Sequence, residues 1–205
     1  MGLSRLFDPA AQIVVDASTV INVNATGYGA RILKAIPNSV IITDVVQGEL
    51  LEDSRNGRND GQMVAAMVSA DLIAIAKLDD LTRNHFEALV IGSGDATLDD
   101  GEAATIAYGV EKGAVALIDE RKATRLCGAR YPQLVVGNSL DIFAHDEVLK
   151  ELGEEGLAEA VFNALQNARM RVPTPAIQWV VQLIGSEKAL LCESLPRAVR
   201  VQLEK

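Results

Sequence analysis

The stretch LDDGEAATIAYGVEKGAVALIDERK, residues 98–122, contains three secondary-structure elements in a row. Acidic residues open a run with helical spacing of apolar side chains, and this run stops at Gly113, a residue type common at helix ends. The apolar run 114–118 then reads as a buried strand that ends in Asp119, and residues 120–130 read as a second helix. A helix, a short buried strand and a further helix are typical of α/β proteins.

The same alternation continues on both sides of this stretch. Further strand candidates lie at 13–15, 40–42, 72–76 and 134–136, and the last precedes a predicted helix over 139–152. The other helix candidates begin near residue 18 or cover 30–36, 44–51, 62–70 and 79–90. This spacing implies right-handed crossovers between parallel strands. We therefore expect a three-layer α/β/α fold with a central, mainly parallel sheet of four or five strands.

Residues 151–205 differ in character from the first 150. Leu157, Val161 and Leu165 keep helical spacing, and residues 177–184 form a strongly apolar helix candidate. The sequence therefore predicts a domain over residues 1–150 and a helical C-terminal extension over residues 151–205. The extension is either a helical cap or a self-association surface, and composition does not decide between the two.

The composition is that of a packed globular protein. Of the 205 residues, 49% are hydrophobic and 23% charged, and only 4% are aromatic, so the core must consist of Val, Ile, Leu and Ala. Two cysteines 65 positions apart indicate neither a disulfide framework nor a zinc ribbon. No apolar run is long enough to span a membrane, and the first residues do not read as a signal peptide. We expect a cytoplasmic protein without membrane contact.

The net charge is −9, from 19 basic and 28 acidic residues. This balance opposes a non-specific nucleic-acid binder, because such binding needs clustered Lys and Arg to neutralise phosphates. It does not oppose a nuclease whose carboxylates bind cations.

Four acidic residues occupy positions that the expected topology would bring together. Asp16 and Asp119 each end a strand, Glu49 lies in the helix after the second strand, and Glu102 lies in the first turn of a helix. Close carboxylates repel one another unless cations lie between them. Oxygen ligands without His or Cys suit Mg²⁺ or Mn²⁺, and such ions promote hydrolysis of phosphodiesters. The sequence therefore predicts metal-assisted hydrolysis in one cleft.

The pattern resembles the PIN-domain ribonucleases, a superfamily that includes the VapC-type toxins. The matching segments are IVVDAST (13–19), ITDVVQGEL (42–50), LDDGEAATIAYGVEKGAVALIDERK (98–122) and, more weakly, VVGNSLDIF (135–143). The third segment is the most specific of the four. The resemblance does not extend to the chain beyond about residue 150.

The resemblance implies a role for each acidic position. It implies that Asp16, Glu49, Glu102 and Asp119 are the catalytic residues that bind the metal, that Ser18 supports the first aspartate, and that Asp99 is a neighbour of the site. The third carboxylate is a glutamate here, where many family members have an aspartate, so a longer side chain must reach the metal.

Several of these residues also have a purely structural interpretation. Asp99 and Glu102 form a capping-box pattern, which we favour for Asp99. Arg121, Lys122 and Arg125 begin the helix after Asp119 and could bind RNA phosphates, although a solvated helix face that pairs with acidic neighbours explains them equally well.

The function that these features predict is that of an Mg²⁺- or Mn²⁺-dependent endoribonuclease with RNA as its substrate. By analogy with the VapC toxins, we expect a toxin that a small antitoxin protein blocks, and a homodimer. Adhesion-type metal modules and haloacid-dehalogenase-like phosphatases are disfavoured, because Val20 and Ser18 occupy positions where those proteins need a ligand. An inactive PIN-like protein for RNA binding or assembly remains the alternative.

Overall fold

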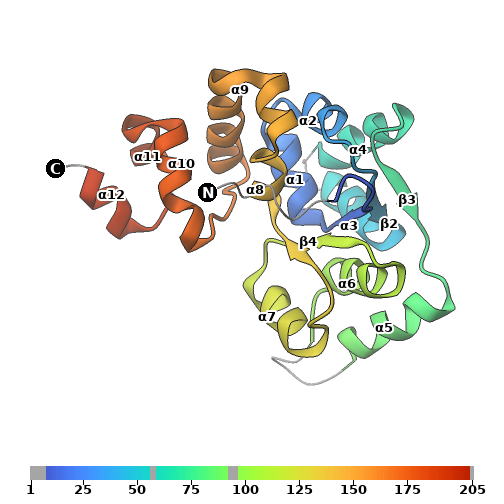
Figure 1. Cartoon of the computed structure of the whole chain (residues 1–205). Helices are drawn as coiled ribbons and strands as arrows, with labels where there is room; N and C mark the ends of the chain where they lie inside the picture. Colours follow the sequence, from blue (N-terminus) through green and yellow to red (C-terminus); the bar gives the residue numbers. More distant parts are fainter. Residues whose placement is uncertain (1–7, 56–58, 92–96, 204–205) are drawn as a thin grey trace.

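The computed structural model describes residues 8–55, 59–91 and 97–203 (Figure 1). Within these ranges the central sheet has five strands, and every pairing in it is parallel. The strands are β1 (Ile13–Val15), β2 (Val40–Thr43), β3 (Ala74–Ala76), β4 (Val115–Leu117) and β5 (Val136–Gly137). Each is short and, apart from β3 and part of β5, buried along its length.

Helices connect the strands and form the whole C-terminal part. Those that lie before β5 are α1 (Ala17–Ala25), α2 (Gly29–Ala35), α3 (Asp44–Arg55), α4 (Asp60–Ser69), α5 (Asp80–Val90), α6 (Asp100–Lys112) and α7 (Arg121–Arg130). Those after β5 are α8 (Ser139–Phe143), α9 (Asp146–Asn167), the 3₁₀ helix η3 (Thr174–Ala176), α10 (Ile177–Ile184), α11 (Ser186–Leu191) and α12 (Arg197–Leu203).

The strand order is β3-β2-β1-β4-β5. The chain starts in the middle of the sheet, extends to one edge through β2 and β3, and then returns to the other side of β1 to form β4 and β5. Val15 at the end of β1 is paired with Leu117 at the end of β4. In parallel sheets, ligands bind beyond the carboxyl ends of the strands, at the point where the strand order reverses. Here that point lies between β1 and β4.

Alternate strand residues pack against different helix layers. Ile13 and Val15 belong to a core cluster that includes buried side chains of α1, α3, α4, α8 and α9. Val14 belongs to a second cluster with residues of α5, α6 and α7. This alternation follows from the two-residue period of a strand. The predicted three-layer α/β/α architecture with a parallel sheet is therefore confirmed (Figure 1).

The predicted helix over residues 139–152 is wrong in one respect, because two helices occupy this range. α8 ends at Phe143, and α9 begins at Asp146 with His145 as its N-cap, whose side chain accepts a hydrogen bond from the Glu147 amide. The apolar pattern of residues 139–152 shows no break, but the capping contact of His145 starts a new helix within this range.

The C-terminal helices extend the same core. Residue 150, where the sequence suggested a domain boundary, lies in the first part of α9, which is interrupted at Gly153 by a non-helical backbone conformation with φ 70° and ψ 171°. Leu157, Val161 and Leu165, which follow this kink, are buried. They share a core cluster with β1, and this cluster continues to Leu195. Among the described helices, none combines the length and the apolar character that a membrane span requires.

Candidate active site

Two aspartates lie side by side at the carboxyl ends of the central strands. Asp16 follows β1 directly, and its amide donates a hydrogen bond to the Leu117 carbonyl of β4 at 3.2 Å. Asp119 lies two residues beyond the end of β4. Burial is the largest cause of the raised pKa of Asp16, and the charge of Asp119 adds to it. Because β1 and β4 are paired in parallel, both aspartates follow strands that end at the same edge of the sheet.

Asp16 is the most deeply buried carboxylate of the site. It is the N-cap of α1, and its Oδ1 accepts a hydrogen bond from the Thr19 amide at 2.7 Å. Its other oxygen, Oδ2, is buried without a hydrogen-bond partner among the described residues. Burial, followed by the Asp119 charge, raises the pKa of Asp16 to about 7. A buried carboxylate with an unpartnered oxygen is unfavourable unless a cation or proton neutralises it.

Glu49 reaches the site from α3 and contacts the first turn of α6. Its Oε1 accepts a hydrogen bond from the Gly101 amide at 2.8 Å. A Cβ atom at residue 101 would lie 2.8 Å from the carboxyl carbon of Glu49, closer than two such atoms can approach. The absence of a side chain at residue 101 therefore lets the carboxylate lie against the helix N-terminus, where backbone amides favour negative charge.

Asp99 and Glu102 lie at the start of α6, and the structure corrects the interpretation that we favoured for Asp99. Asp99 is the N-cap residue, but its side chain makes no capping hydrogen bond. Its exposed carboxylate instead lines the cleft. Glu102, in the first turn of α6, lines the same cleft. Burial, and then the charges of Asp99 and Glu120, raise the pKa of Glu102 to about 7.

Asp119 is held by two polar side chains. Its Oδ2 accepts hydrogen bonds from Asn22 Nδ2 at 2.7 Å and from the Ser139 hydroxyl, and its Oδ1 accepts one from the Ser139 amide at 3.1 Å. Asn22 and Ser139 are both buried, so they fix the orientation of the carboxylate. Burial nevertheless raises the pKa of Asp119. The sequence suggests that Asn22 lines the cleft and that Ser139 belongs to a helix cap, but no pattern links either residue to Asp119, because neither lies near Asp119 along the chain.

The acidic side chains line two adjoining hollows. The first, called here the acidic hollow, is lined by Asp16, Ala17, Ser18, Glu49, Glu52, Asp99 and Glu102. The second, called the junction hollow, is lined by Ser18, Asn22, Asp99, Glu102, Asp119, Glu120 and residues 168–171. Ser18, Asp99 and Glu102 border both hollows, so the two are continuous. Ser18 is exposed between them, and among the described residues it makes no hydrogen bond to Asp16, which Thr19 supports instead.

The predicted single group of ligands is not formed. Within residues 8–55, 59–91 and 97–203, no three acidic, His or Cys side chains make up a group that could hold a metal ion. Glu49 is directed to the Gly101 amide, and Asp119 is directed to Ser139 and Asn22. The donor set nevertheless fits a hard divalent cation, since every candidate ligand atom is a carboxylate oxygen and Asp16 Oδ2 has no partner.

A family model described as a PIN domain matches residues 12–186. The chain belongs to the PIN-domain family. Comparison with curated proteins and with solved structures gives no match.

Membership of the PIN-domain family confirms the superfamily that the motifs indicated. PIN domains are generally nucleases, so the chain has a nuclease-type fold. The family match also continues well past residue 150 and covers α9 and α10. The family model therefore includes the C-terminal helices as far as residue 186. The motifs in the sequence did not indicate this.

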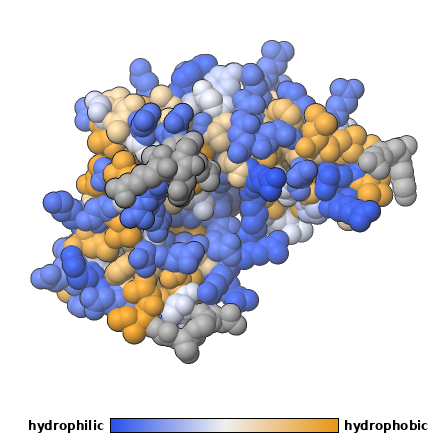
Figure 2. All heavy atoms as spheres, turned by 180° about the vertical axis from the view of Figure 1, so that it is seen from behind, coloured by the Kyte–Doolittle hydropathy of each residue, from blue (hydrophilic) through white to orange (hydrophobic). Residues whose placement is uncertain are grey.

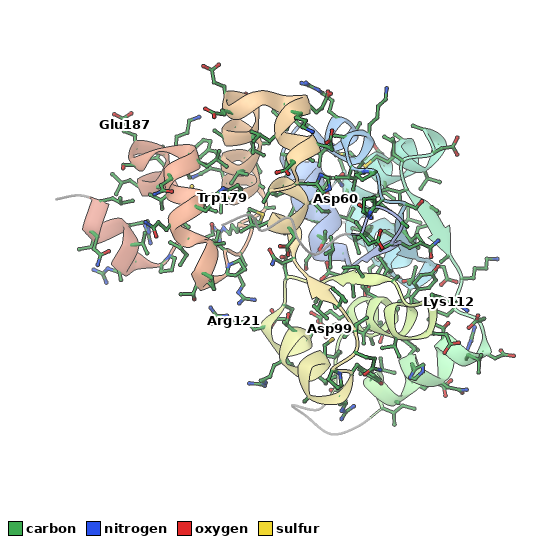
Figure 3. All side chains as sticks on the ribbon, in the orientation of Figure 1. Asp60, Asp99, Lys112, Arg121, Trp179 and Glu187 are labelled. Atoms are coloured by element: carbon green, nitrogen blue, oxygen red, sulfur yellow. The ribbon has the colours of Figure 1, made fainter. Side chains whose placement is uncertain are left out.

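The three basic residues at the start of α7 separate into two groups in this PIN domain. Arg121 and Arg125 border a third hollow, called here the basic hollow, on the β5 side of Asp119. Lys122 is not among the residues that line this hollow, and its charge lowers the pKa of Glu102. Figure 3 shows Arg121 at the start of α7, on the side toward the C-terminal helices, and Asp99 near the start of α6.

Arg171 is a residue of the site that the sequence analysis missed. It follows α9, and its guanidinium donates a hydrogen bond to the Asp119 carbonyl at 2.6 Å. It borders both the junction hollow and the basic hollow. No local motif marks it, because the contact joins residues 52 positions apart.

Proposed function

We propose that this PIN domain is a divalent-metal-dependent endoribonuclease that hydrolyses phosphodiester bonds in RNA. The observation that carries the proposal is Asp16, a fully buried carboxylate with one unpartnered oxygen, placed beside Asp119 at the switch point of the sheet. The Thr19 amide supports one oxygen of this carboxylate, and the other has no partner among the described residues. A cation in the acidic hollow would supply the missing partner.

The proposal assigns Asp16, Glu49, Glu102 and Asp119 as the residues that would hold Mg²⁺ or Mn²⁺. When bound, such an ion would lower the pKa of a coordinated water and neutralise charge on the phosphate. The chain's own contribution is to position the carboxylates. Thr19 orients Asp16, the Gly101 amide orients Glu49, and Ser139 with Asn22 orients Asp119.

The experiment that tests the proposal compares Asp16→Asn and Asp119→Asn with the wild-type protein. Cleavage of a labelled single-stranded RNA is measured with Mg²⁺, with Mn²⁺ and with EDTA. We expect each substitution to reduce metal-stimulated cleavage about 100-fold or more, the size of effect seen when one charge-stabilising group is lost.

A matched control is Glu187→Gln, which removes a carboxylate at the far end of the C-terminal helices (Figure 3). This variant should cleave RNA at the wild-type rate. Metal-stimulated cleavage that survives both aspartate substitutions would overturn the proposal. Absence of metal-stimulated cleavage by the wild-type protein would overturn it as well, and would leave the alternative of an inactive PIN-like protein that binds RNA or serves in assembly.

The toxin role, the antitoxin partner and the homodimer are further proposals that rest on the resemblance to VapC-type proteins. Exposed apolar side chains on the C-terminal helices, Leu191 and Val201, favour a contact surface there. Figure 2 shows hydrophobic side chains over this part of the molecule, and further ones elsewhere on the same face. A small DNA-binding protein encoded in the neighbouring reading frame would support the toxin role, and light scattering of the purified protein tests the dimer.

A further inference from the structure

We propose that Arg171, together with Arg121 and Arg125, binds a phosphate of the RNA strand in the basic hollow, next to the phosphate that is cleaved. This inference rests on the proposed function and extends it. The segment after α9 would then supply part of the substrate-binding surface, so that the C-terminal helices do more than cover the core.

The backbone around Arg171 holds the side chain in place. The chain leaves α9 through Arg169, which has a φ of +52°, a conformation that few non-glycine residues adopt. Met170 is then buried, and its amide donates a hydrogen bond to the Ala164 carbonyl at 3.1 Å. Arg171 follows, with its guanidinium hydrogen-bonded to the Asp119 carbonyl. One of its five N–H groups is thereby used, and the side chain is anchored beside the acidic site.

The basic hollow has the chemistry of a phosphate site. Its polar lining residues are Arg121, Thr124, Arg125, Asn138, Arg171 and Asp119, and the carboxylate of Asp119 accepts hydrogen bonds from Ser139 and Asn22. Among the described residues, none of the three arginines forms an ion pair with a carboxylate. Guanidinium groups bind phosphate oxygens through paired N–H donors. The guanidinium groups of these three arginines form no ion pairs among the described residues, so their remaining N–H donors are available to a phosphodiester group.

Electrostatics support an anionic occupant. The whole chain carries a net charge of −9, so a concentration of unpaired positive charge is unusual for this protein. Arg121 and Arg171 border the same hollow, so an anion bound between the two guanidinium groups would reduce the repulsion between their charges.

The position of the hollow favours RNA over an acidic protein segment as the occupant. The basic hollow shares Asp119 and Arg171 with the junction hollow, and the junction hollow is continuous with the acidic hollow. A strand with regularly spaced phosphates can place one phosphate at the carboxylates and a neighbouring one at the arginines.

The test measures binding of a short fluorescein-labelled single-stranded RNA in EDTA, by anisotropy, over a series of salt concentrations. We expect Arg171→Ala to weaken binding about tenfold at low salt, as is usual when a charged hydrogen bond is lost. The slope of log affinity against log salt should fall by about 0.7, the value for one lost phosphate contact with a single strand. Arg171→Lys should keep the slope but lose part of the affinity, because an ammonium group lacks the paired donors.

Arg197→Ala is the matched control, since Arg197 is an exposed arginine in α12, at the far end of the C-terminal helices (Figure 1). It should change neither affinity nor slope. Should Arg171→Ala fail to fold, Arg121→Ala and Arg125→Ala carry the same test, because both residues are exposed.

The outcomes separate this inference from the proposed function. RNA binding that depends on Arg171 in a protein that does not cleave RNA would support the phosphate site and contradict the nuclease. Wild-type affinity and slope in all three arginine variants, in a protein that does cleave, would overturn the phosphate site alone. Competition by polyglutamate as strong as competition by unlabelled RNA would identify an acidic protein segment as the occupant and would also overturn it.

Discussion

Gly101 is the residue whose lack of a side chain matters most to the site. Its amide donates to Glu49, and the glutamate carboxyl group occupies the space that a Cβ atom would need. We predict that Gly101→Ala displaces Glu49 and lowers metal-stimulated cleavage about tenfold or more, in line with losses seen when metal ligands are misplaced. The measurement is RNA cleavage as a function of Mn²⁺ concentration, in which the required Mn²⁺ concentration should rise.

The control for this prediction is Gly48→Ala, one residue before Glu49 on α3. A Cβ atom there would have nothing within 4 Å. Alanine is the better helix former, so this variant should gain about 0.5–1 kcal/mol in stability and keep its activity. Equal activity of the two variants would show that the contact between Gly101 and Glu49 has no role in the site.

The raised pKa values of Asp16 and Glu102, each about 7, predict how stability changes with pH. In the unfolded chain both carboxyl groups titrate near pH 4. Between about pH 4 and pH 7 the native protein therefore binds more protons than the unfolded chain, and stability falls as the pH rises through this window. For the buried Asp16 the loss amounts to at most about 4 kcal/mol when no cation is present.

Thermal unfolding in EDTA between pH 5 and pH 8 checks this prediction. The melting temperature should fall with rising pH, and Asp16→Asn should make it less dependent on pH. Mn²⁺ added at about pH 7.5 should restore stability, because a bound cation stabilises the ionised carboxylates. A melting temperature that rises over this range in EDTA would contradict the raised pKa values.

At the scale of elements, the first residue of α8 positions the carboxylate that follows β4. Ser139 donates both its amide and its hydroxyl to Asp119, while the neighbouring Asn138 caps α8 and forms a capping box with Asp141. The N-terminus of α8 is therefore capped without the Ser139 side chain, and the Ser139 hydroxyl donates its hydrogen bond to Asp119 instead. We predict that Ser139→Ala lowers cleavage about 10–100-fold, the usual effect of losing a residue that orients a metal ligand.

Folding should be little affected by this substitution, because the capping box stays intact. Circular dichroism and thermal unfolding of Ser139→Ala, measured beside the cleavage assay, check this expectation. Loss of folding together with loss of cleavage would show that Ser139 has a structural role, and rescue of cleavage by Ser139→Thr would show that the hydroxyl is what matters.

At the scale of the whole molecule, the C-terminal helices are part of the core that supports the site. Leu157, Val161 and Leu165 are buried in one cluster with β1. Burial of each such side chain contributes about 1.5–3 kcal/mol, and three of them approach the net stability of a typical domain, about 5–15 kcal/mol. We predict that a fragment of residues 1–150 does not fold, although the sequence pattern suggested a domain of that extent.

The control is a chain that ends at residue 196 and so lacks only α12, which has no buried residues. It should fold with a melting temperature within a few degrees of the full chain. Solubility, circular dichroism and thermal unfolding of both fragments check the prediction. A cooperative thermal transition in the fragment 1–150 would show instead that the first 150 residues form an independent domain.

The sequence by itself determined the α/β class, most element positions and the placing of Asp16 and Asp119 at strand ends. These features depend on local patterns and on one general property of parallel sheets, whose carboxyl ends share an edge. The resemblance to PIN domains added the positions of Glu49 and Glu102.

Only the tertiary structure decided which groups hold these carboxylates. The contacts of Gly101 with Glu49 and of Arg171 with Asp119 each join residues 52 positions apart, and Asn22 meets Asp119 across 97. Such pairs leave no periodic signal along the chain, because their spacing is set by the packing of whole helices on the sheet. The same packing separates the four carboxylates into adjoining hollows and turns the C-terminal segment back toward the site.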